Sequence, residues 1–263
     1  MTSALLCGGL GSRLRSVVGD RPKVLAPVGG RPLLDYQLRR LAGVGVTRVA
    51  LSAGYLAGQI VEYVGDGSRW GLEVTVVVEE VQLGTGGALA LAARTLDLAE
   101  PFLALNGDAL TTISIADLWS AHQTNRVLHA DVHPAATIAV VKTADPSRFG
   151  TVTFDELISH DRHAGAADSA GPLVTGFREK ATATNPPASA SSWINAGVYV
   201  VEPRALAAVP HGQPVSLERD LFPTWIGRLF AFAAPQASLL DIGTPDDYAR
   251  ALEWINKEGW TAE

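Results

Sequence analysis

The N-terminal segment combines glycines, an arginine and a lysine in a way that suits a phosphate group. An apolar run ends in Gly8-Gly9-Leu10-Gly11-Ser12-Arg13, and Pro22-Lys23 follows shortly after. Glycine lets backbone N–H groups approach an anion because no Cβ stands in the way. Arginine offers a bidentate fork to phosphate oxygens, and lysine adds a compact positive charge. The segment therefore predicts a nucleoside triphosphate site.

Two better-known phosphate loops fit this segment poorly. A P-loop requires Lys-Ser or Lys-Thr directly after its last glycine, whereas Ser12-Arg13 follows Gly11. The fingerprint of NAD-dependent dehydrogenases requires a third glycine where Leu14 stands, and an acidic ribose-binding residue in the region of Ser52-Ala53-Gly54-Tyr55. Taken alone, the segment is also compatible with a glycine turn that carries a solvated arginine. The later motifs decide between these interpretations.

Two aspartates follow short apolar runs in distant parts of the chain. Asp108 comes after Leu103-Ala104-Leu105-Asn106-Gly107, and Asp241 comes after Leu240. Ligands of open α/β sheets bind beyond the carboxyl ends of the strands. Two carboxylates that converge there can hold a Mg²⁺ ion that also binds phosphate oxygens. Taken alone, Asp108 is equally compatible with an Asx turn and Asp241 with a cap of the final helix, but together, behind a phosphate-type loop, they favour a metal site.

Further candidates precede and follow a second glycine cluster, Leu83-Gly84-Thr85-Gly86-Gly87. The cluster enters a helix after a strand, and its backbone is suited to a close approach by a base or ribose. Glu79 stands just before it, and a carboxylate accepts two hydrogen bonds, which matches the N1–H and N2–H₂ donors of guanine. An exposed glutamate at a strand end is the competing interpretation.

The second half carries residues that suit a sugar phosphate. Glu179-Lys180 ends one expected strand, and Asn195-Ala196-Gly197 lies on the next. Lysine can neutralise a phosphate, whereas Glu and Asn suit sugar hydroxyls. Each of these residues alone is most often a solvated surface residue.

The expected elements place these residues at strand ends. Strands at 4–7, 46–52, 74–78 and 102–105 alternate with helices at 34–41, 57–64, 86–94 and 115–124. This alternation predicts an α/β fold with a parallel sheet covered on both faces. Beyond residue 135 we expect strands at 137–141, 150–154, 174–177, 194–201 and 239–241, a hairpin tip at 161–171 and a surface loop at 182–192. A final helix follows Thr244 as N-cap. We predict one domain, 1–263.

Composition narrows the class of protein. The 263 residues carry a net charge of -6, which disfavours non-specific binding to nucleic acid. The single cysteine, Cys7, forms no internal disulfide and fits a reducing compartment, where we expect it to be a small core residue. The chain shows neither a secretory signal pattern nor a membrane-spanning run. We expect a cytoplasmic protein without a membrane partner, and a homodimer stays open.

In their order and spacing, the motifs resemble those of the sugar-1-phosphate nucleotidylyltransferases over nearly the whole chain. They are Gly8-Gly9-x-Gly11-x-Arg13 with Pro22-Lys23, Leu83-Gly84-Thr85-Gly86-Gly87, Asn106-Gly107-Asp108, Glu179-Lys180, Asn195-Ala196-Gly197 and Asp241-Ile242-Gly243-Thr244-Pro245. Within that family, Arg13-Leu14-Arg15-Ser16-Val17-Val18 and Ser216-Leu217-Glu218-Arg219-Asp220-Leu221-Phe222-Pro223 are most similar to the D-glycero-α-D-manno-heptose 1-phosphate guanylyltransferases.

The resemblance implies a three-layer αβα sandwich with a mixed, mostly parallel central sheet, the Rossmann-like nucleotidyltransferase fold. It implies transfer of GMP from GTP to that heptose phosphate, with residues 1–130 mainly binding nucleotide and 131–263 mainly binding sugar phosphate. Mannose 1-phosphate, a cyclitol phosphate, UTP or dTTP, and a non-catalytic sensor of the same fold, stay open. The implied catalytic residues are Arg13, Lys23, Asp108 and Asp241, of which the two aspartates bind Mg²⁺. Nucleotide-binding residues are Leu6, Gly8, Gly9, Gly11, Ser12, Arg13, Lys23, Glu79, Gly84, Thr85, Asn106 and Gly107. Sugar-phosphate-binding residues are Gly150, Glu179, Lys180, Asn195 and Gly197.

Overall fold

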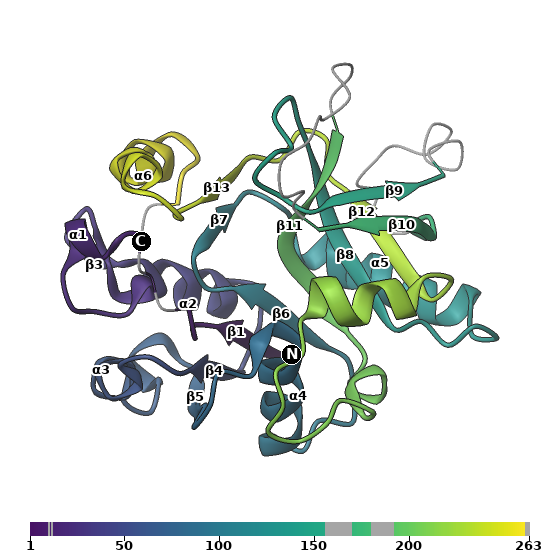
Figure 1. Ribbon diagram of the computed structural model, residues 1–263, viewed down its shortest axis with the longest axis horizontal. Helices are drawn as coiled ribbons and strands as arrows, with labels where there is room; N and C mark the ends of the chain where they lie inside the picture. Colours follow the sequence, from purple (N-terminus) through teal and green to yellow (C-terminus); the bar gives the residue numbers. More distant parts are fainter. Residues whose placement is uncertain (10, 12, 156–169, 180–191, 261–263) are drawn as a thin grey trace.

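A nine-stranded sheet forms the centre of the molecule (Figure 1). The computed structural model describes residues 1–9, 11, 13–155, 170–179 and 192–260. Ser12, Lys180, nearly all of the expected hairpin tip at 161–171 and nearly all of the expected loop at 182–192 lie outside these residues. Among the described helices, none is long and apolar enough to cross a membrane.

The first half of the chain builds the parallel part of the sheet. Strand β1 pairs in parallel with β4 and β6, and β4 pairs in parallel with β5, as the βα alternation predicts. Strands β1, β4 and β6 are mostly buried, because helices cover both faces, whereas the edge strand β5 buries only Val74 and Val77. Their bounds are β1 (Thr2–Leu6), β4 (Arg48–Ala53), β5 (Glu73–Val78) and β6 (Phe102–Asn106).

The second half extends the same sheet with antiparallel pairs. Strand β11 pairs antiparallel with β6, β8 and β9, while β10 pairs with β9 and β12 runs parallel to β8. Seen along β1, only β10 and β11 of these nine strands run in the opposite direction, so the sheet is mixed and mostly parallel, as expected. The bounds are β8 (Ala136–Thr143), β9 (Thr151–Phe154), β10 (Val174–Arg178), β11 (Ser192–Val201) and β12 (Leu229–Ala233).

Two apolar clusters, one on each face of the sheet, produce the three layers. On one face, buried leucines of α2, such as Leu34 and Leu38, pack with Ile60 of α3 and Leu118 of α5. On the other face, Leu89 of α4 packs with residues from the helical turns between 203 and 225. The helices are α2 (Leu33–Gly43), α3 (Ala57–Val64), α4 (Gly84–Thr95) and α5 (Ile115–Leu128). The expected αβα sandwich is confirmed.

A third cluster lies at one end of the sheet and involves two small ribbons. One ribbon joins β7 (Ala109–Thr111) to β13 (Leu239–Asp241), and the other joins β2 (Pro27–Val28) to β3 (Arg31–Pro32). Leu110 and Leu240 of the first ribbon pack with Ile255 of α6 (Pro245–Lys257) and with Val18 of α1 (Arg15–Val18). Figure 1 shows α6 beside α1, β3 and β13. Elements from the first and last parts of the sequence therefore pack together here.

Candidate active site

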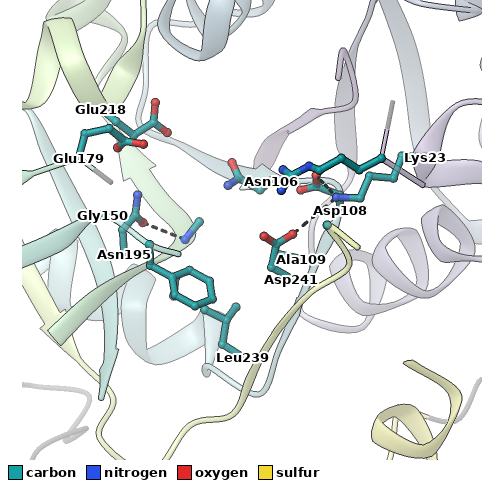
Figure 2. A pocket seen from close by; sticks show the side chains of 15 residues that line it. Lys23, Asn106, Asp108, Ala109, Gly150, Glu179, Asn195, Glu218, Leu239 and Asp241 are labelled. Carbon is teal, nitrogen blue, oxygen red and sulfur yellow. Dashed lines mark hydrogen bonds and ion pairs between the residues drawn. The ribbon is translucent and has the colours of Figure 1, made fainter. Parts of the chain in front are cut away.

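A cavity of about 210 Å³ opens beside Asn106, at the carboxyl end of β6 (Figure 2). Its walls come from the N-terminal loop, the β6–β7 turn, β11, the end of β10 and the β13–α6 turn. The lining residues are Arg13, Lys23, Asn106, Asp108, Ala109, Phe149, Gly150, Glu179, Asn195, Ala196, Gly197, Glu218, Leu239, Asp241 and Gly243. Residues that are far apart in the sequence therefore share one polar space.

Both candidate metal ligands converge on one lysine. The Lys23 Nζ atom lies 2.6 Å from Asp108 Oδ2 and 3.5 Å from Asp241 Oδ1. The lysine side chain is only 11% exposed, whereas those of Asp108 and Asp241 are 38% and 25% exposed. The two carboxylates thus face the cavity with a nearly buried cation between them. Arg13 is exposed and lines the same cavity.

Pairing between β7 and β13 brings the two aspartates together. Ala109 lies opposite Asp241 in the antiparallel register, and the Ile242 N–H donates to the Asp108 carbonyl at 3.0 Å. Asp241 therefore does not stand at an end of the main sheet, where the sequence placed it. It stands on the small ribbon, which reaches over the carboxyl end of β6.

The first turn of α6 anchors the end of this ribbon. The Asp247 N–H donates to the Thr244 hydroxyl, which makes Thr244 the N-cap, as expected. The buried Asp247 carboxylate also accepts hydrogen bonds from Arg148 and Arg250. Burial alone raises the pKa of Asp247, but the hydrogen bonds from Arg148, Thr244 and Arg250 outweigh it and lower the pKa to about 2. Asp247 is thus an ionised anchor next to the cavity.

The donor set at Asp108 and Asp241 fits a magnesium ion bound together with a nucleotide. Mg²⁺ is usually held by one or two carboxylates, with water and substrate phosphate oxygens completing its shell. The two aspartates already share a cation, the Lys23 ammonium. In the described part of the chain, no group of three or more His, Cys, Asp and Glu side chains could hold a metal unaided. A metal at this site therefore needs oxygens from a substrate or from water.

Glu79 lies against the first glycine loop. An ideal Cβ on Gly8 would come within 2.8 Å of Glu79 Oε1, so only glycine fits there without displacing the carboxylate. The other carboxylate oxygen accepts a hydrogen bond from the Leu83 N–H at 3.0 Å. Burial raises the pKa of Glu79, and the Leu83 bond only partly offsets this effect. The strand-end glutamate is thus half-buried next to Gly8.

The second glycine cluster packs against the chain itself. An ideal Cβ on Gly84 would lie 2.7 Å from the Val215 carbonyl oxygen, and one on Gly86 would lie 3.2 Å from the same atom. The Gly86 and Gly87 N–H groups donate to that carbonyl at 2.9 and 3.0 Å. We expected these glycines to admit a base or ribose. In the structure Gly84, Gly86 and Gly87 also contact the segment around Val215, and the nucleotide contact of this cluster stays a prediction.

Asn195 and Gly197 lie in an irregular part of β11. The pairing with β8 shifts register between Asn195 and Tyr199, and Gly197 has φ +70°, a conformation that favours glycine. The Asn195 side chain accepts from the Gly197 N–H at 2.9 Å and donates to the Tyr199 hydroxyl at 2.8 Å. The Asn195 N–H donates to the Gly150 carbonyl, which holds β9 beside the bulge (Figure 2).

Of the sequence-predicted residues, nine line the cavity and eight described ones do not. Those in the lining are Arg13, Lys23, Asn106, Asp108, Gly150, Glu179, Asn195, Gly197 and Asp241. Those outside it are Leu6, Gly8, Gly9, Gly11, Glu79, Gly84, Thr85 and Gly107. Sequence reasoning assigned no role to Glu218, Phe149 or Leu239. For Glu218 a signal existed, because the Ser216–Pro223 segment belongs to the family resemblance.

Comparison with known proteins agrees with the motifs. Residues 3–258 match the family model described as "Nucleotidyl transferase". The mannose-1-phosphate guanylyltransferase of Mycobacterium tuberculosis is 37% identical over 253 residues, covering 94% of this chain but 62% of that protein. The chain thus spans less than two thirds of that relative's length.

Solved structures extend the likeness to the fold. HddC from Yersinia pseudotuberculosis, solved in a complex with GMP-PN, is 28% identical with a TM-score of 0.70, covering 97% of this chain and 99% of that one. A putative glucose-1-phosphate thymidylyltransferase from Bacillus anthracis is 19% identical with a TM-score of 0.74, covering 97% and 95%. The second likeness concerns the fold alone.

Proposed function

This chain belongs to the nucleotidyl transferase family, and we propose that it transfers GMP from GTP to a sugar 1-phosphate, releasing pyrophosphate. The observation that carries the proposal is the convergence of Lys23, Asp108 and Asp241 in one cavity with Arg13. Two carboxylates and two cationic side chains in one cavity suit the triphosphate of a nucleotide that binds together with a metal ion. A sugar-binding or nucleotide-binding protein without turnover has no need of that combination.

In the proposed reaction, a phosphate oxygen of the sugar 1-phosphate attacks the α-phosphorus of GTP. The new bond forms as the bond between the α-phosphorus and its bridging oxygen breaks, and pyrophosphate leaves. Little covalent chemistry falls to side chains, so positioning and charge neutralisation supply most of the acceleration. A Mg²⁺ ion held by Asp108 and Asp241 would supply positive charge to the phosphate oxygens.

The remaining roles follow from the position of each side chain. Lys23 neutralises the phosphoryl group that is transferred, because its ammonium lies at the point where the two aspartates meet. Arg13 binds the leaving pyrophosphate from the exposed side of the cavity. Glu79 accepts hydrogen bonds from guanine beside Gly8, and residues 1–130 mainly bind nucleotide. Residues 131–263 mainly bind the sugar phosphate, through Glu179, Asn195 and Gly150.

Two acceptors of the same configuration are candidates. The motifs favour D-glycero-α-D-manno-heptose 1-phosphate, and the complex of HddC with GMP-PN supports a guanine nucleotide as the donor. Mannose 1-phosphate is favoured by the higher identity, 37%, of the Mycobacterium tuberculosis relative. Both sugars share the manno arrangement of ring hydroxyls and differ in the carbons beyond the ring. We place the heptose phosphate first, because its enzymes share the Ser216–Pro223 motif with this chain.

Pyrophosphate release tests the proposal directly. The purified protein is mixed with Mg²⁺, each of GTP, ATP, UTP and dTTP, and each of the two sugar phosphates. We expect the highest kcat/KM with GTP. Asp108→Ala should lower kcat by at least roughly a hundredfold, whereas the exposed carboxylate variant Asp131→Ala should retain it. No pyrophosphate with any pair would overturn the transferase proposal in favour of a sensor, and a preference for UTP would overturn the guanine assignment.

A further inference from the structure

Glu218 lines the cavity at the end opposite Lys23. Figure 2 shows the carboxylates of Glu218 and Glu179 on the same wall, across the cavity from Lys23 and Asp108. Burial raises the pKa of the Tyr199 hydroxyl, and the charges of Glu218 and Glu179 raise it further, while the hydrogen bond from Asn195 lowers it. The cavity thus has a cationic end and an end with two carboxylates.

One oxygen of Glu218 is held by two hydroxyl groups. The Thr85 hydroxyl donates to Glu218 Oε2 at 2.6 Å, and the Ser216 hydroxyl donates to the same atom at 3.0 Å. The Leu217 N–H donates to the Thr85 hydroxyl at 2.7 Å, so Thr85 is fixed in turn. Both bonds end on Oε2, and the Glu218 side chain lines the cavity. A carboxylate positioned in this way presents an acceptor and no donor.

The surroundings of Glu218 are rigid. Its neighbour Leu217 is fully buried, as is Phe222 at the end of the short helical turn that carries Glu218. The carbonyl of Val215, three residues earlier, accepts hydrogen bonds from the Gly86 and Gly87 N–H groups, and the missing Cβ atoms of Gly84 and Gly86 make room for it. The glycine cluster therefore packs against the segment that leads into Glu218 and helps to position it. A side chain fixed by hydrogen bonds and by packed neighbours can discriminate between ligands, because moving it to fit another ligand costs free energy.

We propose that Glu218 determines acceptor specificity by accepting a hydrogen bond from a hydroxyl group of the sugar. This inference rests on the proposed function. The charge pattern orients the substrate: the phosphate is drawn to Lys23, while the two carboxylates repel the phosphate and accept hydrogen bonds from hydroxyls. Thr85 is a positioning residue in this scheme, since it fixes the carboxylate and lies outside the cavity lining.

Glu218→Gln tests the proposal with little change of shape. The glutamine oxygen can keep the Thr85 and Ser216 bonds, which turns the amide N–H₂, a donor, toward the sugar. We expect KM for the sugar 1-phosphate to rise at least about tenfold, as for the loss of a charge-assisted hydrogen bond, while KM for GTP stays within about twofold. Asp131→Asn is the control, because it makes the same change at an exposed carboxylate outside the cavity lining; the KM values for the sugar phosphate and for GTP should both stay unchanged.

Monodeoxy sugar 1-phosphates provide the second readout. For the analogue that lacks the recognised hydroxyl, wild type and Glu218→Gln should have the same KM, so the penalty disappears for that analogue alone. An unchanged KM for the sugar 1-phosphate in Glu218→Gln, or an equal rise for sugar and GTP, overturns the proposal. If the variant unfolds below the assay temperature, Glu218→Asp is measured in its place by the same criteria. Loss of pyrophosphate release in the wild type itself would instead defeat the proposed function.

Discussion

Replacing Lys23 with methionine should tighten the binding of a divalent metal while it slows the reaction. In the free protein the lysine ammonium competes with any metal for Asp108 and Asp241. At 2.6 Å and an effective dielectric constant of about 20, its attraction to Asp108 is ~6 kcal/mol before desolvation and screening are subtracted. Because both aspartates are partly exposed, we expect a net competition of roughly 1–2 kcal/mol.

That free energy corresponds to a change in affinity of roughly 5–30-fold. Titration of Mn²⁺ followed by electron paramagnetic resonance, without nucleotide, should show the variant binding metal tighter by this factor. Turnover with GTP and sugar phosphate should fall by at least roughly a hundredfold, since the same cation is needed during transfer. Lys257→Met, which removes an exposed lysine paired with Glu258 on α6, is the control and should change neither quantity. Equal Mn²⁺ affinity in Lys23→Met and wild type would refute the competition.

Three further predictions concern other parts of the site. Arg13→Ala should lower kcat by roughly a hundredfold with an unchanged melting temperature; near wild-type turnover would reject its role toward pyrophosphate. Glu79 has a raised pKa, so its carboxylate form is lost early as pH falls, and kcat/KM for GTP should decline through that range. In Glu79→Gln both this decline and the preference for GTP over UTP should disappear, and their persistence would argue against guanine recognition. Asp247, with a pKa of about 2 against the ordinary 3.8, should contribute roughly 2 kcal/mol to stability above about pH 4, which is lost as pH falls toward 2. Urea unfolding of Asp247→Asn should show lower stability at pH 7 and a flatter acid dependence; an unaltered acid slope would contradict this.

Periodicity was sufficient to predict most elements. The helix expected at 57–64 spans Ala57–Val64, and the strand expected at 239–241 spans Leu239–Asp241. These segments carry their own signals, an apolar face repeating every three to four residues or a short apolar run followed by a helix cap. The resemblance to the sugar-1-phosphate nucleotidylyltransferases, drawn from motif order, is confirmed by the family model.

Short elements that depend on distant partners escaped prediction. Strand β7 has three residues, and only its pairing with β13, about 130 residues away, makes it a strand. Strand β12, Leu229–Ala233, was not predicted, although it is an apolar run like the one at 102–105. The packing of the glycine cluster at 84–87 against Val215 was not predicted either. Its partner, the segment around Val215, has no signal in the local sequence.

The register in which β13 pairs with β7 determines whether the Asp241 side chain faces the cavity. Side chains alternate between the two faces of a strand, so a shift of β13 by one residue would exchange Asp241 for Leu240 or Ile242 on the cavity side. Deleting one residue from the connection at 234–238 would therefore remove Asp241, a proposed magnesium ligand, from the cavity without any substitution. The length of the connection before β13 is therefore as important for the position of this carboxylate as the identity of the residue itself.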